Sequence, residues 1–234
     1  MRVLLLVGMF SKMNKNVLIV AAHPDDEAIG CGGTMAKHVA NGDSIYVLFM
    51  TNGVGARNAR PQDVENRQAC ARRASQILGV ERSFQLDFPD NKMDAVPLLD
   101  VVQEIEKVIR EVGPETLYTH YSYDLNVDHQ ITHQAVMTAS RPQINCPVKN
   151  IYTFEVLSST EWQSKAKRQF SPQKIVDITD FWCQKKQALE AYGSELRIYP
   201  HSRSLEAIDA LCSLRGCTHG LKKAEGFEVE RVIS

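Results

Sequence analysis

Short, uninterrupted apolar runs alternate along this chain with longer segments of helical periodicity. The apolar runs cover residues 16–22, 45–50, 84–86 and 116–119, and the helical segments cover 27–39, 64–78, 97–112 and 129–139. Apolar runs without a polar face are typical of parallel strands that are covered on both sides. The alternation therefore predicts an α/β fold, a single Rossmann-like three-layer domain with a mostly parallel sheet.

The two ends of the chain differ from this pattern. The C-terminal third is less regular and predicts a strand near residues 151–154 and helices near 181–192 and 205–214. The chain begins with Met1, Arg2 and a short apolar run, but lysines interrupt this run and no small-residue cleavage site follows it. We expect residues 1–12 to be a leader outside the fold and residues 13–234 to form one domain.

The composition argues against several classes of partner. Lys plus Arg number 27 against 28 acidic residues, so a net charge of -1 creates no overall field that favours nucleic acid. No stretch approaches the ~18 apolar residues of a membrane helix. The six cysteines include no Cys-x-x-Cys pair and are interpreted as reduced. We expect a cytoplasmic protein with no transmembrane segment and no nucleic-acid partner, and the sequence leaves a homo-oligomer open.

A histidine and three carboxylates directly follow the first apolar run, as His23-Pro24-Asp25-Asp26-Glu27. Functional groups in open α/β sheets gather at the carboxyl ends of the strands, where this run falls. Adjacent side chains diverge, so one aspartate can bind a metal beside His23 while the other faces the metal-bound water. The alternative is a helix N-cap, which explains one carboxylate but not the histidine.

A second polar run, residues 124–129, follows the fourth apolar run. His129 can complete a His/Asp/His set that leaves a coordination position for water, as in catalytic zinc sites. Asp128 is expected to fix a histidine tautomer. The alternative for His129 is an ordinary histidine at a helix start. His133, one turn later, is interpreted as a structural residue or a support to a metal ligand, because no Glu-x-x pattern accompanies it.

These two runs resemble the zinc N-deacetylases of the PIG-L/LmbE type, on residues 22–27 and on Asn126-x-Asp128-His129. The resemblance extends over about residues 16–139. Such enzymes act on N-acetylglucosaminyl lipids, on precursors of mycothiol and bacillithiol, and on antibiotic sugars. The resemblance implies that the zinc ligands are His23, Asp26 and His129 and that the general base is Asp25. It also implies that Asp128 is the carboxylate beside the last ligand. Arg67 and Asp90 match positions that contact the substrate.

The chain departs from the family pattern at position 126. Many members carry a histidine there, which stabilises the oxyanion or protonates the leaving amine. Asn126 can donate a hydrogen bond to an oxyanion but cannot give up a proton. The acid must then be elsewhere, and the candidates are His120, His201, His219 and the protonated Asp25.

Two polar segments are further candidates for substrate binding. Arg57 lies in a glycine-bearing loop after residues 45–50 and is a candidate for an anionic group, although a solvated loop arginine is the alternative. His201, with Arg203 and Arg215 nearby in the sequence, suits a phosphate or carboxylate. The alternative for the second segment is turn and cap chemistry.

Glycines and tryptophans carry weaker signals. The glycines at positions 30, 32 and 33 predict close packing of a helix on the sheet, because they lie too far beyond the strand for a nucleotide-binding loop. Trp162 and Trp182 are expected in the core, with stacking on a sugar ring as the alternative.

The sequence thus predicts a Zn²⁺-dependent hydrolase that removes an N-acetyl group from a small molecule or glycoconjugate containing an amino sugar. Two alternatives stay open. The first is a zinc amidase acting on a non-sugar acylated amine. The second is a non-hydrolytic, Rossmann-like nucleotide-binding or methyl-transferring protein in which the acidic run only caps a helix.

Overall fold

The computed structural model describes residues 14–55 and 60–234, so the expected leader and Arg57 lie outside the described residues. One seven-stranded sheet organises the chain, in the order β3-β2-β1-β4-β5-β7-β6. The first five strands of this order are parallel, and β7 pairs antiparallel with β5 and β6. The strands are β1 (Asn16–Ala21), β2 (Ser44–Thr51), β3 (Arg82–Phe88), β4 (Thr116–His120), β5 (Asn150–Phe154), β6 (Lys174–Asp177) and β7 (Ala224–Arg231).

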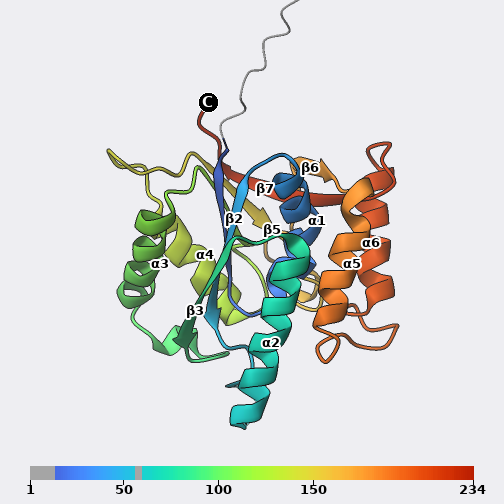
Figure 1. Cartoon of the computed structure of the whole chain (residues 1–234), viewed down its shortest axis with the longest axis horizontal. Coiled ribbons are helices and arrows are strands. Elements are labelled where there is room, and N and C mark those ends of the chain that lie inside the picture. Colours follow the sequence, from blue (N-terminus) through green and yellow to red (C-terminus); the bar gives the residue numbers. More distant parts are fainter. Residues whose placement is uncertain (1–13, 56–59) are drawn as a thin grey trace, which may run out of the picture.

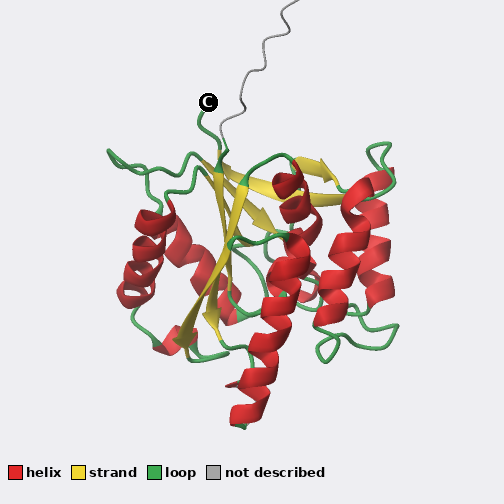
Figure 2. Ribbon diagram, viewed as in Figure 1, coloured by secondary structure: helices red, strands yellow, loops and turns green. Residues whose placement is uncertain are grey.

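Helices cover both faces of the sheet (Figures 1 and 2). One layer is formed by α3 (Leu98–Val112) and α4 (Val127–Ala139), and the other by α1 (Asp26–Ala40), α2 (Pro61–Leu78), α5 (Trp182–Ala191) and α6 (Leu205–Cys217). Single turns of 3₁₀ helix lie at η2 (Met93–Ala95), η3 (Thr160–Trp162) and η4 (Thr179–Phe181). This confirms the predicted three-layer, mostly parallel α/β fold. Among the described residues, no helix has both the length and the apolarity needed to cross a membrane.

The central strand β1 shows why its sequence is continuously apolar. Val17, Ile19 and Ala21 pack into the core beneath α1, α2, α5 and α6. Leu18 and Val20 pack into the second core beneath α3 and α4. A strand covered on both faces has no solvent side on which to place polar residues.

The chain reverses its direction of winding between β1 and β4, which are neighbours in the sheet. The segment after β1 leads to α1 on one face, and the segment after β4 leads to α4 on the other. Loops therefore diverge at the carboxyl ends of these two strands and leave a crevice between them. Both polar runs singled out in the sequence enter this crevice.

The helix α1 is broken at Cys31, whose backbone angles (φ -146°, ψ 19°) are not helical. The backbone groups released by the break are bound by a buried ion pair from the C-terminal third. Lys185 of α5 donates to the carbonyl oxygen of Ile29 at 2.7 Å and contacts Glu225 of β7 at 2.5 Å. The Glu225 carboxylate accepts the amide hydrogens of Gly33 (3.0 Å) and Thr34 (2.7 Å). The ion pair thus caps both sides of the break.

Glycines at the break allow α1 to lie close to its neighbours. A Cβ atom at Gly30 would lie 2.3 Å from the ring of Phe154, and one at Gly33 would lie 2.8 Å from Ile178. Both distances are too short for real side chains, so only glycine fits. The predicted helix–sheet packing is confirmed for Gly30, which faces β5, whereas Gly33 faces the segment just after β6 and Gly32 faces side chains of α5 and α2.

Candidate active site

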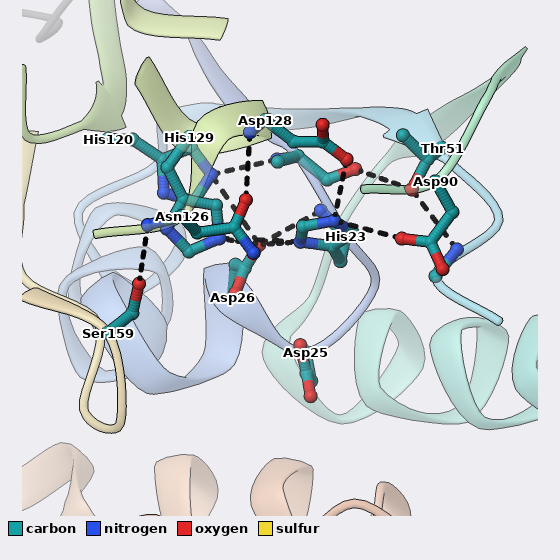
Figure 3. A network of polar contacts seen from close by, with 12 residues as sticks. His23, Asp25, Asp26, Thr51, Asp90, His120, Asn126, Asp128, His129 and Ser159 are labelled. Carbon is teal, nitrogen blue, oxygen red and sulfur yellow. Dashed lines mark hydrogen bonds and ion pairs between the residues drawn. The ribbon is translucent and has the colours of Figure 1, made fainter. Parts of the chain in front are cut away.

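Three side chains from the two strand ends converge in the crevice (Figure 3). His23 and Asp26 follow β1, and His129 lies in the first turn of α4, after β4. His23 Nδ1 lies 3.2 Å from Asp26 Oδ2, and His129 Nε2 lies 3.3 Å from each of these two atoms. All three side chains are buried. Their ligand atoms form a nearly equilateral triangle that could hold one metal ion.

The triangle fits zinc in both chemistry and size. Two imidazole nitrogens and a carboxylate oxygen are typical ligands of a catalytic zinc ion. Zinc–ligand bonds of about 2.0–2.1 Å in tetrahedral geometry separate neighbouring ligand atoms by roughly 3.3 Å. The three observed separations, 3.2–3.3 Å, match this value.

In each histidine of the triangle, the ring nitrogen that points away from the triangle contacts one or two carboxylates. His23 Nε2 lies 3.1 Å from Asp90 Oδ1 and 3.1 Å from Asp128 Oδ2. His129 Nδ1 lies 3.1 Å from Asp124 Oδ1. Such carboxylate partners orient metal-binding imidazoles and fix the tautomer that presents the other nitrogen. The structure brings Asp90 to His23, whereas the resemblance implied a substrate contact for it.

The electrostatics of this cluster favour a cation. Burial opposes a charged His129, but Asp26 and Asp124 outweigh it and raise the pKa of His129 to about 9. The pKa of His23 is likewise raised well above its ordinary value, because hydrogen bonds to Asp128 and Asp26 overcome the effect of burial. Burial favours the neutral form of Asp26, yet the charge of His129 holds the Asp26 pKa well below its usual range. A site that stabilises positive charge so strongly suits a divalent metal.

Asp25 stands apart from the triangle (Figure 3). It occupies the N-cap position of α1, but its side chain makes no capping hydrogen bond. The capping alternative therefore does not account for its carboxylate. Its backbone has a φ of 117°, a strained value for a residue with a side chain, and Glu27 accepts the Asp25 amide hydrogen at 3.0 Å.

Two arginines approach the Asp25 carboxylate, Arg67 from α2 and Arg203 from the turn before α6. Arg203 Nη1 lies 3.3 Å from Asp25 Oδ2, and Arg67 Nη2 lies 3.7 Å from the same oxygen. Burial raises the pKa of Asp25, and the charges of Arg67 and Arg203 partly offset that rise. Arg67 is itself buried and pairs with Glu195 at 3.2 Å. The structure thus brings Arg67 to the carboxylate expected to act as base.

Asn126 is a helix cap. Its Oδ1 accepts the amide hydrogen of Asp128 at 2.8 Å at the start of α4, and its Nδ2 donates to Asn91 Oδ1 at 3.1 Å. One hydrogen of the Nδ2 amide is thereby used, and the second is left for another acceptor. The structure gives Asn126 a local role in the loop beside the ligands.

The three histidines considered as acids differ in their surroundings. His120 is fully buried, accepts the Ala22 amide hydrogen at 2.8 Å and stacks on His129, and burial holds its pKa well below the usual value. His219 is exposed after α6, where its ring contacts the carbonyl of Arg215. His201 is half-buried, and its Nδ1 accepts the Arg203 amide hydrogen at 3.0 Å.

Two further expectations have structural outcomes. His133 donates to the carbonyl oxygen of His120 at 2.9 Å, in agreement with a structural role. Trp182 is partly buried against the core, as expected. The same expectation is wrong for Trp162, which is 52% exposed and lies edge-on to His201 with ring centroids 5.5 Å apart. Trp162 lies on a short 3₁₀ turn, and no helix or strand among the described residues covers its side chain.

Comparison with known proteins agrees with this geometry. Residues 18–140 match the PIG-L family, described as GlcNAc-PI de-N-acetylase. A deacetylase of Escherichia coli K12, YaiS, whose name calls it uncharacterized, is 32% identical over 137 residues, which are 56% of this chain and 71% of YaiS. A diacetylchitobiose deacetylase of Thermococcus kodakarensis is 36% identical over 104 residues, 43% of this chain and 38% of the relative.

Two more similarities extend over most of the chain. The structure of the conserved protein TT1542 from Thermus thermophilus superposes with a TM-score of 0.76 and 26% identity, and covers 94% of this chain and 96% of that one. A 4-oxalmesaconate hydratase of Pseudomonas putida is 24% identical over 203 residues, 80% of this chain and 76% of the relative. These relatives thus include deacetylases as well as a protein named for another reaction. With the family match over more than half of its length, the chain belongs to the PIG-L family.

Proposed function

We propose that this protein is a zinc-dependent hydrolase that removes the acetyl group from the nitrogen of an amino-sugar-containing substrate. One observation carries the proposal: a triangle of buried metal-ligand atoms lies beside a buried carboxylate, Asp25, that neither joins the triangle nor caps its helix. The family description and the name of the Thermococcus relative support an N-acetylated sugar as the substrate. We also propose that residues 13–234 act as one domain.

The metal would be held by His23, Asp26 and His129. When bound there, zinc supplies Lewis acidity that lowers the pKa of water towards ~7 and polarises the acyl carbonyl. The protein's own contribution is then to orient the ligands, through Asp90, Asp124 and Asp128, and to handle protons.

Asp25 is the proposed general base. It accepts a proton from the water molecule whose oxygen attacks the acyl carbon. As the C–N bond breaks, the same carboxyl group returns that proton to the nitrogen, and the products are acetate and a free amine. His120 and His219 are poor candidates for the acid, because His120 is buried against His129 and His219, beyond the end of α6, contacts the carbonyl of Arg215. His201 Nδ1 accepts the Arg203 amide hydrogen, and we place this ring beside the sugar. We therefore assign both roles to the Asp25 carboxyl.

Substrate contacts are proposed for Arg67, Arg203 and His201. Arg67 and Arg203 converge on Asp25 and so lie beside the reacting amide. His201 and the exposed Trp162 together form an aromatic edge suited to a sugar ring. Asp90 is proposed as a support for His23 instead of a substrate contact.

The test is hydrolysis of a panel of N-acetylated sugars, with released acetate and free amine both measured. N-acetylated amines that lack a sugar form the second half of the panel, because a zinc amidase on non-sugar substrates would prefer them. The hydratase relative suggests a third outcome. A hydratase adds water across a double bond and releases no acetate, so absence of acetate from every member of the panel contradicts the proposal.

A further inference from the structure

A second pocket lies far from the metal ligands. Its volume is about 410 Å³, and it opens between the carboxyl-terminal half of α1 and β6. Figure 1 shows these two elements together at the upper side of the sheet, opposite the loops that carry the site. Since α1 begins at the metal ligands and passes this pocket at its other end, the two sites are roughly 15–20 Å apart along the helix.

Two lysines and one aspartate, Asp177, line this pocket, and neither lysine forms an ion pair within the described residues. Lys37 Nζ donates to the carbonyl oxygen of Asp177 at 2.9 Å, and Lys174 Nζ lies 4.2 Å from the centroid of the Tyr152 ring. Within the described part of the chain, neither ammonium is within 4.0 Å of a carboxylate oxygen. The nearby Asp177 carboxylate accepts hydrogen bonds from the amide and hydroxyl of Thr179.

The pocket carries a net positive charge, because Lys37 and Lys174 are balanced by only one lining carboxylate, Asp177, whose pKa is lowered by hydrogen bonds from Thr179 and by the charge of Lys37. Lys174 is half-buried, and burial together with the charge of Lys37 lowers the pKa of Lys174. Burying an ammonium group beside another of the same sign is unfavourable unless an anion compensates it. The aromatic ring supplies only part of that compensation. By contrast, the buried Lys185 has Glu225 as its carboxylate partner.

The remaining lining residues suit an organic anion. Lys37 and Lys174 keep several free N–H donors, and the side chain of Asn41 adds an amide. The apolar wall consists of Ile175, Val176 and Leu221. His38 and Tyr118 also border the pocket and are bonded to each other at 3.0 Å.

We propose that this pocket binds a small phosphate- or carboxylate-bearing organic anion, held by Lys37 and Lys174 and covered on its apolar part by the three aliphatic side chains. The site is independent of the proposed deacetylation, since it shares no residue with the metal cluster.

The experiment uses the full chain with its metal and two probes, inorganic phosphate and phenyl phosphate. An amine-reactive reagent labels the lysines at constant ionic strength, and mass spectrometry follows each site separately. We expect both probes to slow the labelling of Lys37 and Lys174 along a saturable curve and to leave Lys107 unaffected. Lys107 is a suitable control, because it is exposed on α3 beneath the other face of the sheet and pairs with Glu104. Local labelling also separates this site from any phosphate bound at the metal.

Variants sharpen the test. Lys174→Ala and Lys37→Ala are each expected to weaken phosphate binding by about tenfold or more, the loss typical of one charge-assisted hydrogen bond. Lys174→Arg should retain binding, and Lys107→Ala should not change it. Deacetylation should be unaltered in all four variants. Equal slowing at Lys107, or unchanged binding in Lys174→Ala, would overturn the proposal. Phenyl phosphate that binds no tighter than inorganic phosphate would overturn the assignment of an organic ligand.

Discussion

Asp128 contacts His23 through a carboxylate oxygen 3.1 Å from Nε2, although the two residues follow different strands. The same carboxylate accepts the amide hydrogens of Asn91 (2.6 Å) and Met93 (3.0 Å), so its position is fixed by the loop after β3. The residue next to it in the sequence, His129, is held instead by Asp124. The orientation of the two candidate metal-binding histidines therefore depends on contacts that cross between loops.

Asp128→Asn is expected to lower zinc affinity by about 10–100-fold, as is typical when the carboxylate behind a metal-binding histidine is removed. Competition with a fluorescent chelator measures the change. Asp100→Asn, on the exposed side of α3, is the matched control and should keep full affinity. Unchanged affinity in Asp128→Asn would show that the His23 orientation does not depend on this contact.

His129→Ala should abolish tight metal binding while leaving the fold largely intact. The side chain supplies one of three ligand atoms and lies in the first turn of α4, where alanine is well tolerated. Elemental analysis of protein purified without chelator gives the metal content, and circular dichroism reports the fold. Full metal occupancy in this variant contradicts the proposed ligand set.

Zinc affinity should increase with pH across the neutral range. The pKa of His129 is raised to about 9 by Asp26 and Asp124 against the effect of burial, so below that pH a proton competes with the metal. Each competing proton contributes about a tenfold gain in affinity per pH unit below its pKa. Asp124→Asn removes one of the two charges that raise this pKa and should flatten the dependence. Isothermal titrations at several pH values, with proton release corrected through buffers of different ionisation enthalpy, measure the slope.

Asp25→Asn should retain zinc and lose activity by about 10²–10⁴-fold, because the amide has the same shape but cannot take a proton. The substitution should not weaken α1, since the Asp25 side chain makes no capping bond. Metal content, thermal stability and kcat are measured together. A variant within about threefold of the wild-type rate would mean that another group activates the water.

Asn126→Ala combines two effects that a second variant separates. Loss of the cap should cost about 1 kcal/mol of stability, and loss of a donor to the oxyanion should lower kcat by ~10²–10³-fold. Asn126→Asp keeps the capping oxygen and lacks the donor, so it should retain stability and show only the kinetic loss. If both variants keep the wild-type kcat, Asn126 serves only the loop.

Much of the fold and of the candidate metal site can be predicted from the sequence, because both rest on local patterns. The parallel strands are continuously apolar, and two of them end directly before the ligand-bearing runs. Residue type then indicates two histidines and one of two aspartates as candidate ligands, and the resemblance to the family selects Asp26.

The strands β6 and β7 were not predicted, and the sequence of β7 has charged residues of the kind usually found at the surface. The strand β7 contains Glu225 and Glu228, yet both are buried, at 4% and 1% exposure. Their partners, Lys185 and Arg168, lie 40 and 60 residues away in the chain. The short strand β6 has too few residues to show a period. Both strands therefore escaped prediction.

Some contacts of the site could not be predicted either, because they also join residues far apart in the sequence. Asp124 lies within a run that the sequence singled out, but its partner could have been either histidine. Arg203 meets Asp25 from 178 residues away, and only the folded chain brings the two together. Contacts of this kind produce no pattern that can be recognised in a single sequence.

The break in α1 limits how far the chain can be shortened from its C-terminal end. The family match ends at residue 140, which invites expression of the matched segment alone. That fragment would contain the proposed metal ligands but neither Lys185 nor Glu225, so the carbonyl of Ile29 and the amides of Gly33 and Thr34 would lose their partners. The short helical segment bearing Asp26 would then have no anchor at its far end. The segment matched by the family therefore cannot be moved alone into another protein, and a chimera must contain α5 and β7 as well.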